Sequence, residues 1–394
     1  MITVNEALDH LFALAPAMPR ETVPLLQARG RVMIEDAVAR RSQPPFAASA
    51  MDGYGVAAGA AQPGQSFDVI GEAAAGHGFA GVVGPGQSVR IFTGAPVPEG
   101  VGHVVLQEDC SRDGARVTIT GTPGDGTNIR PAGGDFHEGD RLCAPRRLTP
   151  ADLALLASMN VAEVPVSRKP VVALISTGDE LVMPGETPGP DQIIASNTFG
   201  LHALIEEAGA TARLLPIASD NAASLATAFE LAQGADVVVT IGGASVGDHD
   251  IVARVAEEVG MERAFYKIAM RPGKPLMAGR LGAAVMTGLP GNPVSAMVCG
   301  HLFLLPVLRA MMGLSASPAP RIDAILGADV GANGPREHYM RARLSGGVVT
   351  PFDRQDSSLL SILSDANALL VRPISDGPRK SGETVEVVPL SPES

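Results

Sequence analysis

The sequence has few cysteines, few aromatic residues and no tryptophan. Its 394 residues include three cysteines, and only 4% of them are aromatic. Cys110, Cys143 and Cys299 lie far apart and outside any C-x-x-C or metal-ligand spacing, which argues against a cysteine metal site or redox motif. So sparse and odd a count is typical of a reducing compartment, and we expect a cytoplasmic protein.

Basic residues are in the minority. The chain has 30 Lys and Arg against 42 Asp and Glu, which gives a net charge of -12. A general surface for nucleic acid or for an anionic membrane is therefore not expected. Any bound anion must be held by a local cluster of cations.

Long hydrophobic runs are scarce. The most apolar stretch, 294–308, contains His301 and Pro306 and is too short to span a bilayer, so we expect no membrane segment. Residues 1–14 include Glu6 and Asp9 but no Lys or Arg, which does not fit a signal peptide. The apolar residues of this N-terminal stretch instead fit one face of a helix: Val4, Leu8, Leu11 and Phe12.

Glycine and proline are abundant, with 45 and 32 residues spread over the whole chain. We therefore expect tight turns and short strands rather than disorder. We predict an elongated N-terminal domain (1–40 and 136–169), a β-rich insert (41–135), an α/β domain (170–316) and a C-terminal β domain (317–394).

Strands alternate with helices in the third domain, which predicts a doubly wound, mostly parallel sheet. The strands are expected at 171–176, 213–217, 236–241, 264–269 and 283–286. Helices are expected at 197–207 and 222–233, and further helices are expected to begin at Pro150 and at Pro293, each after a capping residue.

Three glycine-rich turns between Thr240 and Ser295 carry the clearest chemical signal. They read I-G-G-A-S-V-G-D-H-D at 241–250, R-P-G-K-P at 271–275 and G-L-P-G-N-P-V-S at 288–295. Each follows a run expected to be a strand, and such loops line the ligand crevice of an open α/β sheet. Their bare amides, cations and carboxylates suit a phosphorylated ligand held with a divalent metal.

The first of these turns combines glycines with acids. Gly242 and Gly243 let the backbone approach a ligand closely, and Asp248 and Asp250 offer oxygen ligands for Mg²⁺. A solvated turn whose acids cap the next helix is the alternative. The segment also matches G-x-S-x-G at Ser245, so a serine hydrolase is a minor alternative, because residues 247–250 separate this serine from a following helix.

The second turn is basic. Two prolines flank Gly273-Lys274 and limit the freedom of the lysine. Lys267 and Arg271 precede Lys274 by seven and three residues. Three cations so close together in an acidic chain predict a phosphate or oxyanion pocket, with solvated surface charge as the alternative.

Polar residues also follow the first strand of the α/β domain. S-T-G-D-E-L at 176–181 offers the Thr177 hydroxyl and the Glu180 carboxylate, which we expect at the same sheet edge as Asp248 and Asp250. In the β-rich insert, S-A-M-D-G-Y at 49–54 and T-G-A-P-V-P-E-G at 93–100 read locally as turns.

Together, these six motifs resemble the MoeA / gephyrin E-domain family, the molybdopterin molybdenumtransferases. They occur in the order and spacing of that family over nearly the whole chain: 49–54, 93–100, 176–181, 242–248, 272–275 and 288–295. The resemblance implies a Mog/MoaB-like α/β domain, a β insert and a C-terminal β-barrel-like domain.

The resemblance implies an enzyme that inserts molybdate into adenylylated molybdopterin, hydrolyses the pyrophosphate linkage and releases AMP and molybdenum cofactor. It also implies Mg²⁺ or Zn²⁺, and a Mog-type adenylyltransferase as a partner. It further implies a homodimer whose site joins the insert of one subunit to the α/β domain of the other. An interaction scaffold of the gephyrin type is the second hypothesis, although a scaffold would not need these acids and cations.

The resemblance assigns roles residue by residue. Catalytic roles are implied for Asp52, Glu180, Asp250, Lys267 and Lys274, and metal binding for Glu180, Asp248 and Asp250. Substrate contacts are implied for Thr93, Arg130, Asp135, Thr177, Asp220, Gly242, Gly243, Ser245, Arg271, Pro290, Gly291, Asn292, Pro293, Arg341 and Ser357. The chain departs from the family at Arg271, where Lys is common; Arg keeps the charge and can bind an oxyanion through two bonds.

Overall fold

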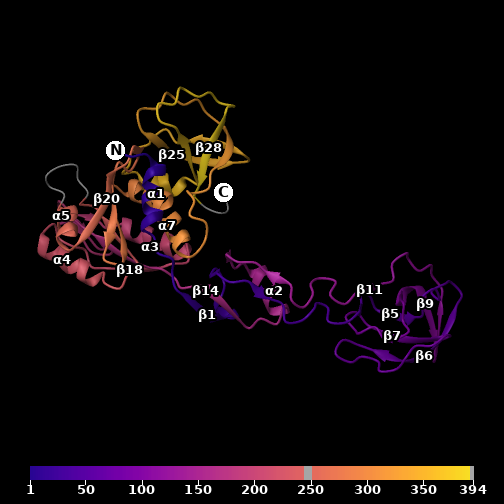
Figure 1. Ribbon diagram of the computed structural model, residues 1–394. Helices are drawn as coiled ribbons and strands as arrows, with labels where there is room; N and C mark the ends of the chain where they lie inside the picture. The colour runs from indigo at the N-terminus through magenta and orange to yellow at the C-terminus, as the bar shows by residue number, and fades with distance from the viewer. Residues whose placement is uncertain (244–250, 391–394) are drawn as a thin grey trace. The chain divides into compact units, whose positions relative to one another are not determined.

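The computed structural model describes residues 1–243 and 251–390 of the chain (Figure 1). The contacts divide the chain into two compact units. Unit 1 comprises Met1–Glu21, Gly30–Ile34 and Val166–Ser394, and unit 2 comprises Thr22–Arg29 and Glu35–Pro165. The finer division into four domains stays a prediction.

A six-stranded sheet of order β18-β15-β19-β23-β22-β20 forms the centre of unit 1. The strands are β18 (Thr211–Leu214), β15 (Val171–Ser176), β19 (Val237–Ile241), β23 (Ala284–Leu289), β22 (Pro275–Leu281) and β20 (Met261–Lys267). The first four are parallel, as expected for the continuous apolar runs of strands covered on both faces. The predicted mostly parallel sheet is confirmed.

One strand of this sheet was not predicted. β22 is antiparallel to both β23 and β20, so β20 runs in the same direction as the four parallel strands. The pairing of β20 with β22 changes register around Phe265, and β20 ends two residues before the predicted end at 269. The carboxyl end of β20 therefore lies at the same sheet edge as the ends of β15, β19 and β23.

Helices cover both faces of the sheet (Figure 1). α4 (Ala222–Leu231) and α5 (Ile251–Glu258) pack on one face, while α1 (Val4–Leu14), α3 (Asn197–Glu207) and the helix 293–311 pack on the other. Neighbouring residues of one strand point into different cores: Val238 lies in the core under α4 and α5, and Val239 lies in the core with Leu201. This alternation makes the sheet doubly wound.

The helix 293–311 is longer than the apolar stretch at 294–308. It joins α6 (Pro293–Cys299), a π-helical turn η3 (Gly300–Leu304) and α7 (Leu305–Met311). Pro306 does not end the helix because it lies in the first turn after the π-helical segment, where the backbone hydrogen-bond pattern is already offset. By length and composition alone this helix could cross a membrane, so the expectation that it is too short was wrong; 72% of its apolar window is buried within the fold.

The C-terminal part of unit 1 is a closed barrel. Strands β25 (Glu337–Ser345), β26 (Val348–Pro351), β24 (Ile322–Leu326), β28 (Thr384–Pro389) and β27 (Ala368–Arg372) follow one another around it. β27 pairs with β25 and closes the circle, which confirms the barrel-like domain. α8 (Leu360–Asp365) follows β26, and β21 (Met270–Arg271) pairs in parallel with β25. The chain around Arg271 is thereby attached to the barrel.

Unit 2 contains a six-stranded sheet of order β8-β5-β7-β6-β10-β9. The strands are β8 (His103–Leu106), β5 (Gly53–Val56), β7 (Gln87–Ile91), β6 (Ser66–Ala73), β10 (Arg116–Ile119) and β9 (Cys110–Asp113). Beside it, β4 (Ala48–Ser49) pairs with β11 (Ile129–Arg130). α2 (Pro150–Ser158) begins after Thr149, whose side chain accepts from the backbone N–H of Asp152 in a capping box.

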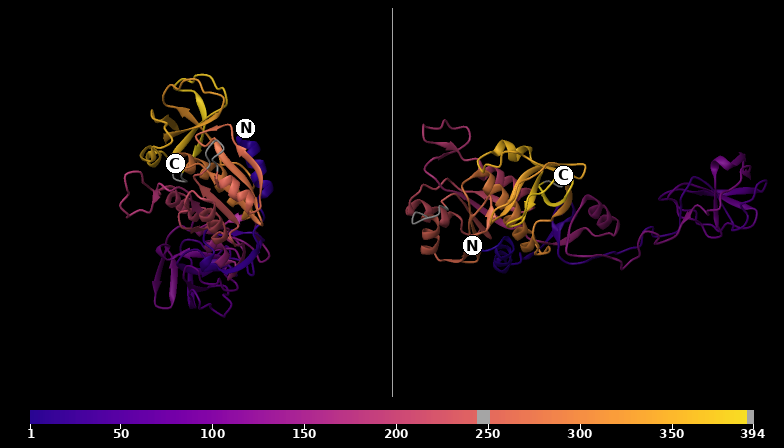
Figure 2. Two further views of the ribbon diagram at one scale, coloured as in Figure 1. Left: turned by 90° about the vertical axis from the view of Figure 1, so that its left-hand side faces the viewer. Right: turned by 90° about the horizontal axis from the view of Figure 1, so that it is seen from above.

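Short elements make up the rest. Two of them, β16 (Leu181–Val182) and β17 (Ile193–Ile194), form a parallel ribbon in the connection between β15 and α3, which stands away from the sheet (Figure 2). The others are β1 (Arg20–Pro24), η1 (Leu25–Gln27), β2 (Val32–Met33), β3 (Ala37–Val38), η2 (Gln107–Asp109), β12 (Arg141–Leu142), β13 (Arg146–Arg147) and β14 (Glu163–Ser167).

Candidate active site

The carboxyl edge of the central sheet holds a first cleft of about 630 Å³. The segments that follow β15, β19 and β23 line it, and ligands of open α/β sheets bind at this carboxyl end of the strands. Thr177, Glu180, Asp220 and Asn292 contribute polar side chains, and Ile193 and Ile194 contribute apolar ones. The cleft therefore joins hydroxyl, carboxylate and amide groups to a small apolar wall.

Two glycines allow the turn after β19 to pass close to its neighbours. Gly242 and Gly243 have φ angles of 96° and 66°, a region that residues with a side chain rarely adopt. A Cβ atom on Gly243 would lie 2.2 Å from Cγ2 of Val252, and one on Gly242 would lie 2.8 Å from the carbonyl oxygen of Thr177. The G-G pair predicted from the sequence is thus required for close packing at the cleft.

Backbone pairing brings the other segments to the same place. Thr177 bridges to Ala218 in parallel, which carries Asp220 to the rim of the cleft. The backbone N–H of Asp220 donates to Oδ1 of Asp179 over 3.2 Å. Asn197, at the start of α3, donates from Nδ2 to the carbonyl oxygen of Gly291 over 2.7 Å, and so fixes the turn that precedes α6.

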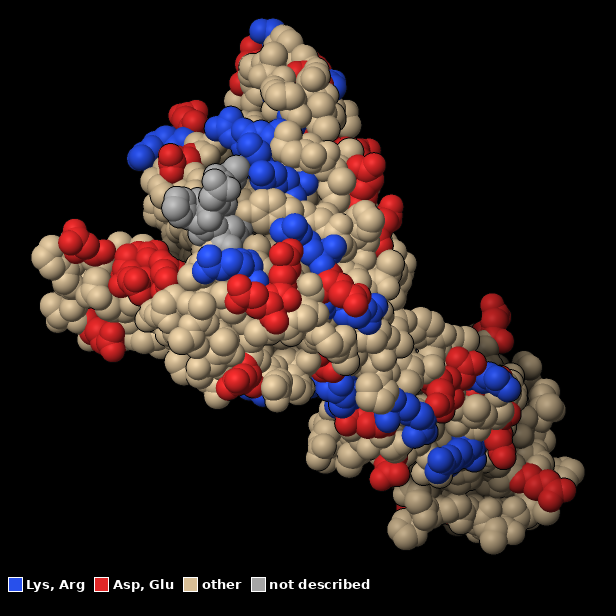
Figure 3. Space-filling model, turned by 60° about the vertical axis from the view of Figure 1, so that its left-hand side comes forward, with Lys and Arg blue, Asp and Glu red and all other residues tan. Residues whose placement is uncertain are grey.

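A second cleft, of about 290 Å³, adjoins the first and shares Pro275 and Asn292 with it. Arg271, Lys274 and Arg336 line it, together with the carboxylate of Asp356. The surrounding face of unit 1 carries a gathering of Lys and Arg side chains (Figure 3). Three cations against one acid give this cleft a positive charge that suits an anion.

The three cations come from different elements. Arg271 lies in β21, opposite His338 in β25. Lys274 lies in the turn between β21 and β22, and Arg336 directly precedes β25. Burial, together with the charges of Arg271 and Arg372, lowers the pKa of His338 to about 4. This imidazole is therefore neutral at neutral pH and lies in electropositive surroundings.

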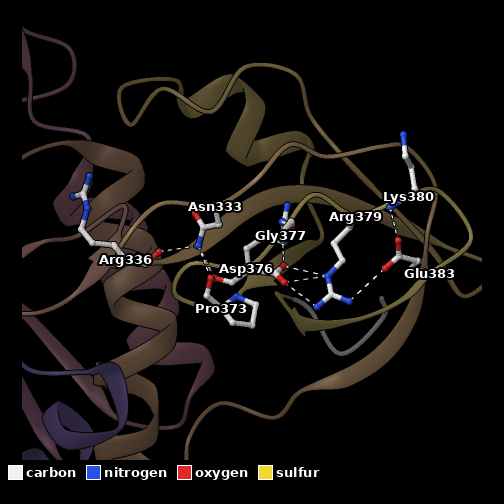
Figure 4. Close-up of polar contacts among 9 residues, drawn as sticks. Asn333, Arg336, Pro373, Asp376, Gly377, Arg379, Lys380 and Glu383 are labelled. Atoms are coloured by element: carbon white, nitrogen blue, oxygen red, sulfur yellow. Dashed lines mark hydrogen bonds and ion pairs between the residues drawn. The ribbon is translucent and has the colours of Figure 1, made fainter.

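Asn333 fixes the segment that carries Arg336 (Figure 4). Its Nδ2 donates to the carbonyl oxygens of Arg336 over 2.8 Å and Pro373 over 2.6 Å. Asp376 accepts from the guanidinium groups of Arg372 over 2.6 Å and Arg379 over 2.8 Å. These bonds hold the start of β25 to the turn after β27.

The segment 354–359 closes the second cleft on the barrel side. Its Ser357 contacts the start of α6 twice: the backbone N–H of Val294 donates to the Ser357 carbonyl over 3.0 Å, and Asn292 Nδ2 donates to Ser357 Oγ over 3.1 Å. Asn292 consequently makes no side-chain cap for α6.

The structure brings most of the predicted residues of the α/β domain together. The first cleft collects Thr177, Glu180, Asp220, Gly242, Gly243, Pro290, Gly291, Asn292 and Pro293. The second collects Arg271, Lys274, Asn292 and Ser357. Ser245, Asp248 and Asp250 lie outside the described residues.

Two predicted residues lie elsewhere within unit 1. Lys267, at the end of β20, is absent from both linings as far as the described residues define them; its Nζ lies 5.2 Å from the ring centroid of Tyr266. Arg341 is buried, with 1% of its surface exposed, and donates to backbone carbonyls. The substrate contact expected of Arg341 stays a prediction.

Arg336 and Asp356 are the residues that sequence reasoning missed. Arg336 stands beside Glu337, and Asp356 follows Asp353 and Arg354, so each lies among charges of both signs and neither matches a motif named above. They reach the cleft only because the barrel closes and packs beside α6, which no local pattern encodes.

In unit 2, Asp52 and Thr93 form a pair. Oδ1 of Asp52 accepts from the backbone N–H of Thr93 over 2.8 Å and from its hydroxyl over 2.7 Å. These two bonds lower the pKa of Asp52 below its usual value. The motifs at 49–54 and 93–100, read locally as separate turns, therefore meet in one arrangement that leaves Oδ2 of Asp52 free of those bonds.

Arg130 and Asp135 also lie in unit 2, where backbone hydrogen bonds position them. Arg130 in β11 pairs with Ala48 in β4, four residues before Asp52. The backbone N–H of Asp135 donates to the carbonyl oxygen of Gln43 over 2.9 Å. Both side chains are exposed.

Metal-ligating side chains are sparse in the described part of the chain. Outside 244–250 and 391–394, no group of three or more His, Cys, Asp or Glu is arranged to hold a metal ion. Glu180 and Asp220 both line the first cleft. Their oxygens suit Mg²⁺, and no described residue of that lining is a His or Cys of the kind Zn²⁺ prefers.

Comparison with known families accounts for nearly the whole chain. Residues 2–160 match the MoeA N-terminal region (domain I and II), 173–310 match a probable molybdopterin binding domain, and 323–390 match the MoeA C-terminal region (domain IV).

Individual relatives agree with these matches. The chain is 35% identical to the molybdopterin molybdenumtransferase of Haemophilus influenzae, with 99% of each chain covered. It is 33% identical to that of Bacillus subtilis, which covers 100% of this chain and 95% of the relative. The fold is similar to the crystal structure of the MoeA protein from Pyrococcus horikoshii, with a TM-score of 0.84, 30% identity and 99% of both chains covered.

Proposed function

Because the chain belongs to the MoeA family of molybdopterin molybdenumtransferases, we propose that it inserts molybdate into adenylylated molybdopterin. The pyrophosphate linkage to AMP is hydrolysed, and AMP and molybdenum cofactor leave. The observation that carries the proposal is the pair of adjoining clefts at one sheet edge. One suits an extended phosphorylated ligand and the other suits a small oxyanion.

The first cleft takes the adenylylated molybdopterin. Its glycine-rich turns present backbone where a pyrophosphate can approach closely. The Asn292 amide gives one N–H to Ser357 and has a second for a phosphate oxygen, while Ile193 and Ile194 offer apolar surface to a ring system. Pro290 and Pro293 stiffen the turn before α6.

The second cleft takes molybdate. Arg271, Lys274 and Arg336 balance its charge, and Ser357 adds a hydroxyl. The shared residues Pro275 and Asn292 mean that an oxyanion there lies next to a ligand in the first cleft. Such adjacency holds the two reactants together and lowers the entropic barrier to their reaction.

We propose that a divalent cation, Mg²⁺ in preference to Zn²⁺, is held by Glu180 with Asp248 and Asp250. The oxygen donors of the first cleft favour Mg²⁺, which commonly completes its shell with substrate phosphates and water. When bound, the cation offsets the repulsion between these carboxylates and the pyrophosphate.

We further propose a cytoplasmic homodimer whose active sites combine Asp52 of one subunit with Asp250 of the other, supplied with substrate by a Mog-type adenylyltransferase. In a two-fold dimer, each single mutation at these aspartates disables every site. Mixing Asp52→Asn and Asp250→Asn proteins and letting subunits exchange should restore roughly one quarter of the native activity, because about half the dimers are mixed and each has one intact site. A mixture that stays inactive although heterodimers form contradicts the shared site.

The function itself is tested with purified protein, adenylylated molybdopterin, Mg²⁺ and molybdate. AMP release that requires molybdate is the expected result. Ligand binding and dimer formation without AMP release would favour the scaffold hypothesis. Ester hydrolysis lost in Ser245→Ala would favour the hydrolase.

A further inference from the structure

The Arg341 side chain is one of the largest fully buried side chains in the described part of the chain, with 1% of its surface exposed. It lies in β25 and contacts the segment 354–359, but it is not among the residues that line the second cleft. Burial lowers the pKa of its guanidinium, and the Asp356 carboxylate partly offsets that effect. A buried cation is costly unless its donors are used, so its hydrogen bonds indicate what it does.

Those hydrogen bonds span one segment from end to end. Nη1 donates to the carbonyl oxygen of Leu359 over 3.2 Å, and Nη2 donates to that of Arg354 over 3.3 Å. The planar fork of a guanidinium can reach two such acceptors at once, which the single ammonium of lysine cannot do in the same geometry.

The backbone of Arg341 is tied to the same segment. Its N–H donates to Oε1 of Gln355 over 2.9 Å, and Nε2 of Gln355 donates back to the Arg341 carbonyl over 3.0 Å. Asp356 Oδ1 then accepts from the Ser358 backbone N–H over 2.9 Å. Side chain and backbone of one residue therefore fix the rear of the segment.

The front of the segment faces the second cleft. Gln355, Asp356 and Ser357 line that cleft, and the Ser357 carbonyl accepts from the backbone N–H of Val294 over 3.0 Å. If the rear bonds were lost, Ser357 would be free to leave α6, and the wall of the cleft opposite Arg271 and Lys274 would open.

We propose that Arg341 is a positioning residue that holds segment 354–359 against the start of α6 and thereby sets the affinity of the second cleft for its oxyanion. The oxyanion part rests on the proposed function; the positioning part does not. The effect of Arg341 on the oxyanion passes through Ser357 and not through direct contact.

The test compares Arg341→Met and the milder Arg341→Lys with native protein, and uses Arg343→Met as a matched control. Arg343 lies on the same strand, is exposed and donates to the Asp365 carbonyl outside the segment. Hydrogen exchange of peptides that contain Val294 and 354–359 is measured without ligand, and sodium molybdate binding is measured by calorimetry.

We expect faster exchange of both peptides in Arg341→Met, with the rest of unit 1 unchanged, and an intermediate rate in Arg341→Lys. Molybdate should bind about ten- to a hundredfold more weakly in Arg341→Met, the scale of a lost charge-assisted contact, while KM for adenylylated molybdopterin stays near native. Arg343→Met should match native protein in each respect.

Unchanged exchange at Val294 and 354–359 overturns the positioning role whatever the ligand data show. Faster exchange with native molybdate affinity overturns the link to the cleft. If native protein binds no molybdate, the proposed function fails, and the exchange data alone still decide whether Arg341 holds the segment. If Arg341→Met does not fold, Arg341→Lys carries the same comparison.

Discussion

Replacing Lys274 by alanine should weaken molybdate binding without loss of the fold. Lys274 lies in a cleft of about 290 Å³ with two other cations, Arg271 and Arg336, and one carboxylate, Asp356. The substitution removes one of the three positive charges and leaves the carboxylate of Asp356 in place. The electrostatic attraction of the cleft for a dianion therefore falls in addition to the loss of one direct contact.

The size of the effect follows from the contact that is lost. A hydrogen bond to a charged group contributes roughly 1.5–3 kcal/mol, which corresponds to about a ten- to 150-fold rise in Kd. Because the cleft is open to solvent on one side, we expect the lower half of that range at physiological ionic strength, where exposed charges are screened over about 8 Å.

Calorimetric titration of molybdate into native and Lys274→Ala protein measures this change. Lys380→Ala is the matched control, since Lys380 is 76% exposed and pairs with Asp329 over 2.8 Å on the barrel. Equal affinity of native and Lys274→Ala protein at low salt would refute the assignment of the second cleft. An equal loss of molybdate affinity in Lys380→Ala would show that the effect comes from the overall charge of the protein and not from the second cleft.

Three further predictions concern pKa values and stability. Thr93→Val removes the hydroxyl bond to Asp52, so the pKa of Asp52 should rise toward the ordinary value of about 3.9 in an NMR titration; an unmoved pKa would show that the hydroxyl bond does not contribute. Burial lowers the pKa of His301 to about 4, so the unfolded chain binds more protons below its own pKa of about 6.5. The stability associated with neutral His301 is fully present above that value and is lost as pH falls toward 4. In denaturant melts, His301→Gln should remove this loss, which amounts to at most about 3 kcal/mol between pH 6.5 and pH 4; an equal loss in the variant would contradict the burial argument. Asp236 accepts two bonds from Arg168 and one from the Val171 backbone N–H, so Asp236→Asn should lower the free energy of unfolding by about 2–3 kcal/mol, and a change below about 0.5 kcal/mol would show that the pair is solvated.

Sequence patterns were most informative where local chemistry decides the structure. The bounds of α3 and β15 match the prediction, because a polar start precedes α3 and an unbroken apolar run forms β15. Thr177 and Glu180 were expected at the cleft because they follow a parallel strand, whose end lies at the ligand edge. The G-G pair at Gly242 was equally visible, since its conformation demands glycine.

Tertiary packing decided the rest. β22 escaped prediction because its start coincides with the Lys274 turn and it contains Gly279, which weakens a strand pattern. Arg336 and Arg341 are the same residue type and lie five residues apart. Arg336 lines the second cleft, whereas Arg341 is buried. Only the closure of the barrel distinguishes them, and that closure depends on pairing between β25 and β27.

The most direct measurement is the release of AMP from adenylylated molybdopterin by the purified protein with Mg²⁺, with and without molybdate. The proposed function predicts AMP release that depends on molybdate, is lost after removal of the metal with EDTA, and saturates at higher molybdate concentration in Lys274→Ala than in Lys380→Ala. AMP release that proceeds fully without molybdate, or no AMP release from folded protein that binds both substrates, would contradict it.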